Sequence, residues 1–309
     1  LATHGTPEQQ AALLPGVGAG EVLLTPALRE VGRALSDRPE ATYRDGRVSG
    51  RKVGVSLAKV AGRMLVSARG EEDDEDVVVL VDPSGPGVTL AESGSSARLT
   101  QHTVVLDEAP AEPLLPGAAR RLTDLAVAGL ALTAAGVVAG ARDLTASYIK
   151  ERSQFGRALA QFQAVAMQAA DIYIGARTVD LAAENAAWRV GAGLDAADDL
   201  AVAAYWVTTE ATRTLHICHH LHGGMGVDET YPLHHYFSWV KDIAHALGAR
   251  AEDVPLEDPA SKNLELTASQ RALKAEIRAY FHGLADAESH RDIGIDRHGE
   301  TYQRVVRQM

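Results

Sequence analysis

The stretch that decides the fold reads Tyr148-Ile149-Lys150-Glu151-Arg152-Ser153-Gln154-Phe155-Gly156-Arg157 and continues, after a short gap, to Phe162-Gln163. Helical patterns flank it, and downstream the apolar residues recur at steps of three and four, on one helix face: Phe162, Val165, Ala169, Ile172, Ala176 and Val179. The stretch therefore predicts a turn between two antiparallel helices. It gathers a cation, an amide and an aromatic ring where backbone groups are free. That combination suits a ligand with phosphates and a flat ring; the alternative is an ordinary turn with a solvated arginine.

This turn resembles the signature of the flavin-dependent acyl-CoA dehydrogenase family, because it has the form Y-x-K-E-R-x-Q-F-G-R followed by F-Q. In that family the matching arginine, phenylalanine and glutamine reach the FAD that a neighbouring subunit binds. The resemblance therefore implies FAD as the cofactor, with Arg152, Phe155 and Gln163 as cofactor-binding residues.

The composition is that of a globular protein, because 46% of the 309 residues are apolar and 23% are charged. The formal net charge of −11 argues against a surface that binds nucleic acid or an anionic membrane. We find no run of about eighteen apolar residues of the kind that forms a transmembrane helix, and no signal peptide. The single cysteine, Cys218, excludes an internal disulfide and fits a reducing cytosol, so a cytoplasmic location is expected.

The chain is expected to contain a β domain followed by a helical domain, which is an α+β fold class. Residues 21–117 alternate short apolar runs with turn signals, and Asp45-Gly46 between two such runs is a hairpin signal. They predict an antiparallel β domain, either a small barrel or a sandwich. Residues 118–250 carry long helical patterns that predict an antiparallel four-helix bundle.

Both ends of the chain suggest that it is part of a longer one. Residues 1–20 are similar to the run that closes the N-terminal helical domain of acyl-CoA dehydrogenases, and the rest of that domain is missing. Residues 251–264 carry charge and proline and predict a linker. Residues 265–309 resemble the opening helices of a second such unit; the alternative is a C-terminal helical tail that packs on the bundle.

The β domain keeps only part of the family's flavin motifs. The family usually has L-T-E-P-x-x-G-S-D, whereas Leu24 to Glu30 reads L-T-P-A-L-R-E, so Thr25 matches and the Gly-Ser-Asp is absent. The family's N-G-x-K-x-W-I-T places a Trp and a Thr beside the isoalloxazine ring. Here Gly54 stands at the Trp position, and Ser56 keeps a hydroxyl. The resemblance implies Thr25 and Ser56 as residues of a weakened FAD site; Ser56 as a plain strand hydroxyl is the alternative.

The third long helix ends in a histidine-rich stretch that could bind a metal. His216 with His220, and Cys218 with His222, are each four residues apart and could ligate zinc from one helix face. Cys218 lies on the apolar stripe, however, and no carboxylate or second cluster completes a ligand set. We therefore expect no metal.

The same stretch resembles a second cofactor motif of the family. Residues 221–226 are similar to the end of Q-x-x-G-G-x-G, in which a helix breaks at paired glycines and the backbone approaches a neighbour's FAD. The histidine at position 220 takes the place of the glutamine. The resemblance implies His220, Gly223 and Gly224 as cofactor-binding residues.

The two positions at which the family carries its catalytic glutamate hold residues that cannot accept a proton. Residues 231–242 resemble Y-P-V-E-x-x-x-R-D-A-K, and counting from them places Leu247 at one base position. Counting back from Arg152 places Ala126 at the other. The chemistry needs a carboxylate that removes an α-proton while hydride leaves for the flavin. The nearest ionisable residues are two positions away, about 200° round a helix: Asp124 and His245.

The resemblance covers residues 1–250 as one incomplete unit, and it is greatest to the paired catalytic and degenerate units of steroid-degrading actinobacteria. It implies a component of a flavin-dependent acyl-CoA dehydrogenase, acting on an acyl-CoA thioester, for which a steroid side-chain CoA is the analogy. A second acyl-CoA dehydrogenase unit, in a homo- or hetero-oligomer, would be the partner and would supply the base. The alternative is a structural partner that binds no flavin of its own, and an oxidase of the same fold is a lesser variant.

Overall fold

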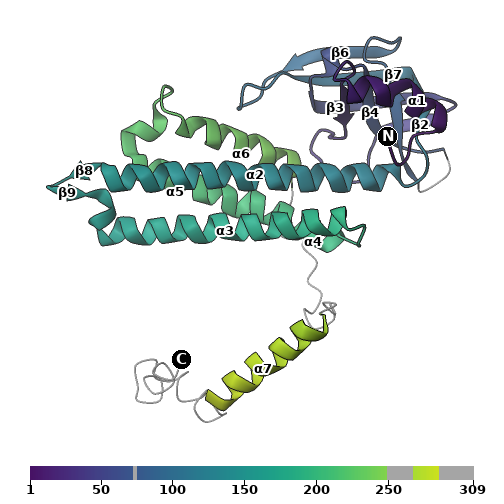
Figure 1. Cartoon of the computed structure of the whole chain (residues 1–309). Coiled ribbons are helices and arrows are strands. Elements are labelled where there is room, and N and C mark those ends of the chain that lie inside the picture. The colour runs from purple at the N-terminus through teal and green to yellow at the C-terminus, as the bar shows by residue number, and fades with distance from the viewer. Residues whose placement is uncertain (72–74, 249–266, 285–309) are drawn as a thin grey trace. The chain divides into compact units, whose positions relative to one another are not determined.

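The computed structural model describes residues 1–71, 75–248 and 267–284 (Figure 1). The chain divides into two compact units, Leu1–Pro255 and Leu256–Met309. The first unit contains a β-barrel followed by a helical bundle, so the expected α+β class and order of domains are confirmed. The second contains one described helix, α7 (Ala268–Leu284). The expected linker lies outside the described residues.

Seven strands form one sheet that closes on itself as a small barrel. The closed ring runs through β4 (Arg63–Arg69), β2 (Thr42–Arg44), β3 (Arg47–Ser56), β7 (Gln101–Pro113) and β5 (Asp76–Val81), which pairs back onto β4. Two more strands extend it, β1 (Leu24–Ala27) beside β4 and β6 (Val88–Ser93) beside β7. Most pairs are antiparallel, as expected, but β1 and β2 each run parallel to β4. A long connection from Leu28 to Ala41 lets the chain return in the same direction, as parallel pairing requires.

The expected hairpin joins β2 to β3. Arg44 pairs with Arg47, and the two turn residues, Asp45 and Gly46, have φ of 48° and 73°. Positive φ at both positions matches the twist of a two-residue hairpin. The barrel interior is filled by aliphatic side chains that alternate along these strands: Val48, Val55, Met64, Val66, Val79, Val81, Val104 and Leu106.

The bundle consists of four antiparallel helical rods, as expected. They are α2 (Ala118–Glu151), α3 (Gln163–Gly191), the continuous run α4 (Ala197–Trp206), η3 (Val207–Ala211) and α5 (Thr212–His222), and α6 (Leu233–Leu247). A π-helical turn, η3, joins α4 to α5. The apolar stripe on which Cys218 lies is buried along the whole of this third rod: Leu200, Ala204, Val207, Ala211, Leu215 and Cys218. Short 3₁₀ turns complete the unit at η1 (Ala58–Val60), η2 (Leu159–Gln161) and η4 (Gly223–Val227).

Helix α1 (Pro7–Gly18) begins with a capping box between Thr6 and Gln9. Apolar residues at this end of the chain pack with the outer side of the barrel and the start of α2, in a third cluster: Leu1, Leu13, Leu65, Val78, Leu80, Leu114 and Leu122. This cluster attaches the first turns of α2 to the barrel.

Helix α2 differs from the expectation about membrane-spanning segments, because it is long and apolar enough to cross a membrane by length and composition. Its apolar character has another explanation in the fold. The helix contacts α3, α5 and α6 along its length, and small buried residues make these contacts close. A Cβ added at Gly140 would lie 2.6 Å from the Tyr236 ring of α6. The helix is the central rod of the bundle.

A buried ion pair anchors the connection that follows β1. The Lys52 ammonium donates to a Glu30 carboxylate oxygen at 2.7 Å, and both side chains are almost inaccessible, at 0% and 4% exposed. Glu30 also accepts hydrogen bonds from the backbone amides of Glu40 and Ala41, and Lys52 donates to Ser67. Burial alone would raise the pKa of Glu30, but Lys52 and the two amides together hold it below its ordinary value of 4.5.

Replacing Lys52 by Met should lower the free energy of unfolding by about 3–5 kcal/mol, because it leaves a buried carboxylate without its counter-charge. Urea unfolding at pH 7 measures the loss. The exposed Lys59, which lies just after β3, provides the matched control, Lys59→Met. The folded-state pKa of Glu30 is lowered, so its stabilisation is complete above pH 4.5 and is lost as the pH falls through the folded-state value. Glu30→Gln should remove this acid dependence, and a Lys52→Met loss no larger than that of the control would refute the assignment.

Candidate functional site

The sequence-predicted site residues lie in two separate sets. The bundle-end set lies where α2 meets α3 and where α5 meets α6: Arg152, Phe155, Gln163, His220, Gly223 and Gly224. The barrel set consists of Thr25 on β1 and Ser56 on β3. Figure 1 shows the two ends, because β8 and β9 mark the α2–α3 turn and lie at the end of the bundle remote from the barrel.

The turn between α2 and α3 is a miniature hairpin, formed by β8 (Ser153–Gln154) and β9 (Arg157–Ala158). At its tip Phe155 has a φ of 52°, which is uncommon for a bulky residue, and its side chain is 92% exposed. Arg152 is held by its backbone, since its amide donates to Tyr148 and its carbonyl accepts from Leu159. Its side chain is exposed. The predicted turn is confirmed, and it presents a cation and a ring to the outside.

The second turn is fastened to the first through His222. The Tyr148 ring on α2 stacks on the His222 ring with centroids 4.3 Å apart, and the Tyr148 hydroxyl donates to the His222 carbonyl. His222 is buried, and burial lowers its pKa, so the imidazole is held neutral. Its Nδ1 lies 2.8 Å from the Cys218 carbonyl and its Nε2 lies 3.2 Å from the Tyr231 hydroxyl. The two turns therefore form one surface.

The paired glycines leave open space on this surface. Gly223 ends α5 with a φ of 57°, a conformation that favours glycine. Gly223 and Gly224 are both exposed, and a Cβ added at either position would meet nothing within 4 Å. His220 and Gln163 are exposed as well. Packing within the described chain does not require the absence of a side chain at Gly224, so the space is free for another molecule.

The histidine-rich stretch does not assemble metal ligands within the ranges that the structure describes. His222 uses both ring nitrogens inside the bundle. Cys218 is buried, and burial raises the pKa of its thiol to about 11, so it is not available as a thiolate.

The barrel set borders a cavity of about 640 Å³, here termed the barrel–α6 cavity. Its walls come from the barrel, from α2 and from α6: Thr25, Arg29, Gly54, Ser56, Gln101, Ala126, Leu130, Trp239, Asp242 and Ile243. The Thr25 hydroxyl donates to the Ser56 carbonyl at 2.6 Å. The structure thus brings Thr25 and Ser56 together, but the Thr25 hydroxyl donates its hydrogen bond within the protein and not to a ligand.

An arginine occupies the space beside Gly54. A Cβ added at Gly54 would lie 2.9 Å from Nη1 of Arg29, and Gly54 has a φ of 64°. The flat aromatic wall that the resemblance implies at this position is therefore replaced by a guanidinium from the loop after β1. Together with the engaged Thr25 hydroxyl, this arrangement does not fit a flavin ring bound by the barrel set. The exposed bundle-end set carries a guanidinium, a ring and hydrogen-bonding groups, which are chemically suited to phosphates and a flat ring.

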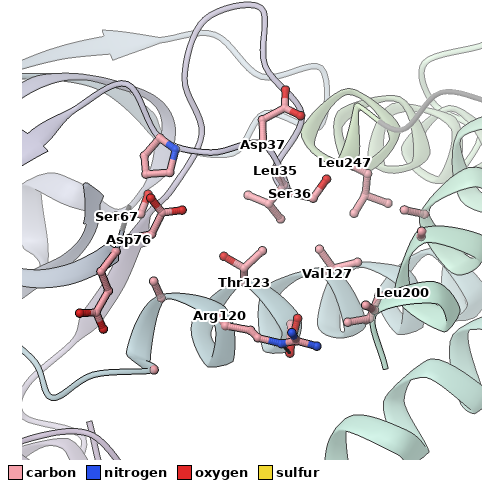
Figure 2. Close-up of a pocket in the computed structure, with 18 residues that line it drawn as sticks. Leu35, Ser36, Asp37, Ser67, Asp76, Arg120, Thr123, Val127, Leu200 and Leu247 are labelled. Carbon is pink, nitrogen blue, oxygen red and sulfur yellow. Dashed lines mark ion pairs between the residues drawn. The ribbon is translucent and has the colours of Figure 1, made fainter. Parts of the chain in front are cut away.

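The two expected base positions face different cavities. Ala126 lines the barrel–α6 cavity. Leu247 is 2% exposed and borders a second cavity of about 590 Å³, between the barrel and α4. Figure 2 shows this barrel–α4 cavity, with Leu247, Val127 and Leu200 on one side and the barrel residues Ser67 and Asp76 on the other.

Asp124, two positions from the expected base, also lines the barrel–α4 cavity. Burial raises the pKa of its carboxyl, and Arg120 opposes the rise from 3.8 Å away. Asp124 therefore faces away from Ala126, as the helical geometry predicts.

Sequence reasoning missed Arg29 and Asp242 as residues of the barrel–α6 cavity. Asp242 on α6 accepts hydrogen bonds from the Ser95 hydroxyl and from the amides of Ser96 and Ala97. Although burial would raise the pKa of Asp242, these bonds hold it below its ordinary value. Two features of the sequence could have indicated Arg29. Position 54 holds a glycine in place of the family's large side chain, and Arg29 is a cation in the loop after β1.

Comparison with known proteins agrees with these features. Residues 118–250 match the family described as Acyl-CoA dehydrogenase, C-terminal domain. Acyl-CoA dehydrogenase FadE28 of Mycobacterium tuberculosis is 45% identical over 252 residues, which are 81% of this chain and 72% of the relative. FadE27 of the same organism is 34% identical over 266 residues, covering 80% of this chain and 69% of that relative.

Two solved structures are similar over the same region. One is a variant of the Tcur3481-Tcur3483 steroid ACAD, with a TM-score of 0.75 and 38% identity, and it covers 82% of this chain and 70% of that chain. The other is the ChsE4-ChsE5 complex from Mycobacterium tuberculosis, with a TM-score of 0.74 and 30% identity over the same shares of the two chains.

Replacing Asp242 by Ala should release the loop between β6 and β7 from α6, because three hydrogen bonds to one carboxylate are lost. We expect about 1.5–3 kcal/mol less stability and faster tryptic cleavage after Arg98, which lies in this loop. Limited proteolysis followed by mass spectrometry measures the cleavage. The exposed Asp107 on β7 supplies the control, Asp107→Ala; equal cleavage rates in the two variants would show that Asp242 does not hold the loop.

Proposed function

Because the chain belongs to the acyl-CoA dehydrogenase family, we propose that it is a component of a flavin-dependent acyl-CoA dehydrogenase and completes the FAD site of a partner unit. When bound, FAD supplies the hydride acceptor of such an enzyme. In this proposal the bundle-end set of the chain contacts that cofactor from outside, and the barrel set holds no flavin of its own.

The observation that carries the proposal is the distance between the two sets. Ala126 at the barrel–α6 cavity and Arg152 at the end of α2 are 26 positions apart on one straight rod. At the rise of an α-helix this separation is about 39 Å, longer than an extended FAD molecule. A cofactor held at the barrel of this chain cannot reach its bundle end, so the bundle-end set would serve the cofactor of another chain.

The bundle-end side chains suit that role chemically. The exposed guanidinium of Arg152 fits a pyrophosphate, to which it can donate two parallel hydrogen bonds. The exposed Phe155 ring offers a flat apolar surface for an adenine, and its positive φ is the kind of local strain that collects at ligand sites. Gln163 and His220 supply amide and imidazole hydrogen-bonding groups, and the open space at Gly224 admits a close backbone approach.

The chain lacks a base at the positions that the resemblance indicates. Ala126 and Leu247 have no group that accepts a proton, and Leu247 is enclosed by apolar neighbours. Removal of an α-proton would therefore fall to a carboxylate of the partner unit. This division of roles supports a second acyl-CoA dehydrogenase unit as the partner.

The outer face of α3 supports an oligomer. Four large apolar side chains lie exposed on it at steps of seven residues: Met167, Ile174, Leu181 and Trp188. A seven-residue apolar repeat forms a seam that winds only slowly around a helix, about 20° per repeat, and such a seam is suited to packing against another helix. The similar ChsE4-ChsE5 structure is itself a complex. We extend the proposal to an acyl-CoA thioester with a steroid side chain as the substrate, on the analogy of the steroid ACAD, and to a cytoplasmic location.

A second candidate function is a structural partner without any flavin contact, for which the exposed apolar repeat on α3 would be sufficient. The two functions differ in what the bundle-end set does. Only the first requires Arg152 to contact a cofactor.

Arg152→Ala should weaken FAD retention in the assembly with a catalytic acyl-CoA dehydrogenase unit by about ten- to a hundredfold, the value of one charge-assisted Arg–phosphate contact. Equilibrium dialysis of FAD measures the loss. Arg152→Lys should recover only part of it, because an ammonium lacks the two-pronged fork. Arg177→Ala, at an exposed arginine in mid-α3, is the control. Unchanged flavin content together with a lower melting temperature would favour the structural function.

The chain on its own, supplied with FAD, a steroid side-chain CoA thioester and an electron-accepting dye, should show no oxidation above the flavin-free background, because Ala126 and Leu247 cannot take the α-proton. An acyl-CoA dehydrogenase with its glutamate in place is the positive control for the assay. Turnover by this chain alone would contradict the proposed dependence on a partner's base.

A further inference from the structure

Arg29 is a half-buried cation without a close partner. Its Nε is inaccessible to solvent and has no hydrogen-bond acceptor, and among the described residues no ion pair to its guanidinium is found. The opposing charge that acts on the guanidinium is the Asp242 carboxylate, which partly offsets the lowering of the Arg29 pKa by burial. That carboxylate already accepts three hydrogen bonds from the loop between β6 and β7. A buried donor without an acceptor is costly, and a ligand that supplies the acceptor would relieve the cost.

The surroundings of Arg29 are otherwise apolar. The barrel–α6 cavity measures about 640 Å³, within the range of small-molecule sites. Aliphatic and aromatic side chains make up much of its wall: Leu28, Leu57, Leu125, Leu130, Trp239 and Ile243. Of all residues that line it, Arg29 and Asp242 are the two that are ionisable at neutral pH.

We propose that the barrel–α6 cavity binds an apolar molecule that carries one carboxylate, with the carboxylate on the Arg29 guanidinium and the hydrocarbon against the apolar wall. A planar guanidinium matches a carboxylate with two parallel hydrogen bonds. The charge balance favours a monoanion over a phosphate dianion, because Asp242 already offsets part of the arginine charge. This site is separate from the bundle-end set, so it goes beyond the proposed function and does not depend on it.

The experiment titrates the full chain with decanoate and, separately, with decan-1-ol by isothermal calorimetry. Decanoate should bind about ten- to a hundredfold more tightly, the value of a charge-assisted hydrogen-bonded contact. Arg29→Met should remove that advantage and leave decan-1-ol binding within about threefold of the original. Arg51→Met, at an exposed arginine on β3 outside the cavity, is the charge-matched control and should change neither affinity.

A second variant keeps the test decisive if Arg29→Met does not fold. Arg29→Lys keeps the positive charge but lacks the two parallel donors of a guanidinium, so it should retain only part of the advantage of decanoate over decan-1-ol. Arg152→Ala should leave decanoate binding unchanged, which separates this site from the proposed FAD contact. Equal affinities for acid and alcohol, no binding of either, or a decanoate affinity that Arg29→Met does not alter would each overturn the proposal.

Discussion

The buried pair of Lys52 and Glu30 determines the chemistry of the barrel–α6 cavity. Glu30 is tied to Lys52 and to two backbone amides, and the adjacent Arg29 carbonyl accepts from Val53 on β3. These bonds fix the loop after β1 against the barrel, and so they fix where the Arg29 side chain starts. An unpaired charge at either position would be expensive in the interior. The loop, the guanidinium and the shape of the cavity therefore depend on one ion pair that does not itself line the cavity.

Local patterns predicted the parts of the fold that local forces control. Residues close together in sequence determine these features. The apolar stripes of α3 and of the α4–α5 rod follow from helical periodicity, and the Asp45-Gly46 hairpin follows from turn chemistry. The parallel pairing of β1 and β2 with β4 could not be read in this way, because it joins strands separated by a long connection. Helix α2 also differs from what its sequence led us to expect, because it meets the length and hydropathy criteria for a membrane span, while its small buried residues pack against neighbouring helices.

The site residues likewise fall into those that sequence motifs locate and those that depend on the three-dimensional arrangement. Motifs located the bundle-end residues, and the two turns that carry them do come together, through Tyr148 and His222. Counting along the chain gave Ala126 and Leu247 as equivalent positions, yet they border different cavities. Position in sequence does not specify which wall a side chain joins. The displacement of an aromatic wall by Arg29 was also hidden, because it depends on the path of a loop and on the backbone at Gly54.

The length of α2 has a consequence for how such a chain can change over time. Substitutions at sites this far apart, without shared neighbours, affect stability additively to within about 0.3–0.5 kcal/mol. The barrel end can therefore accumulate changes without disturbing the outer end of the bundle. After a gene duplication, one copy can therefore lose the function of the barrel set and retain the function of the bundle-end set. Two paralogues that each lose the function that the other keeps form an obligate hetero-oligomer, because neither subunit is active without the other.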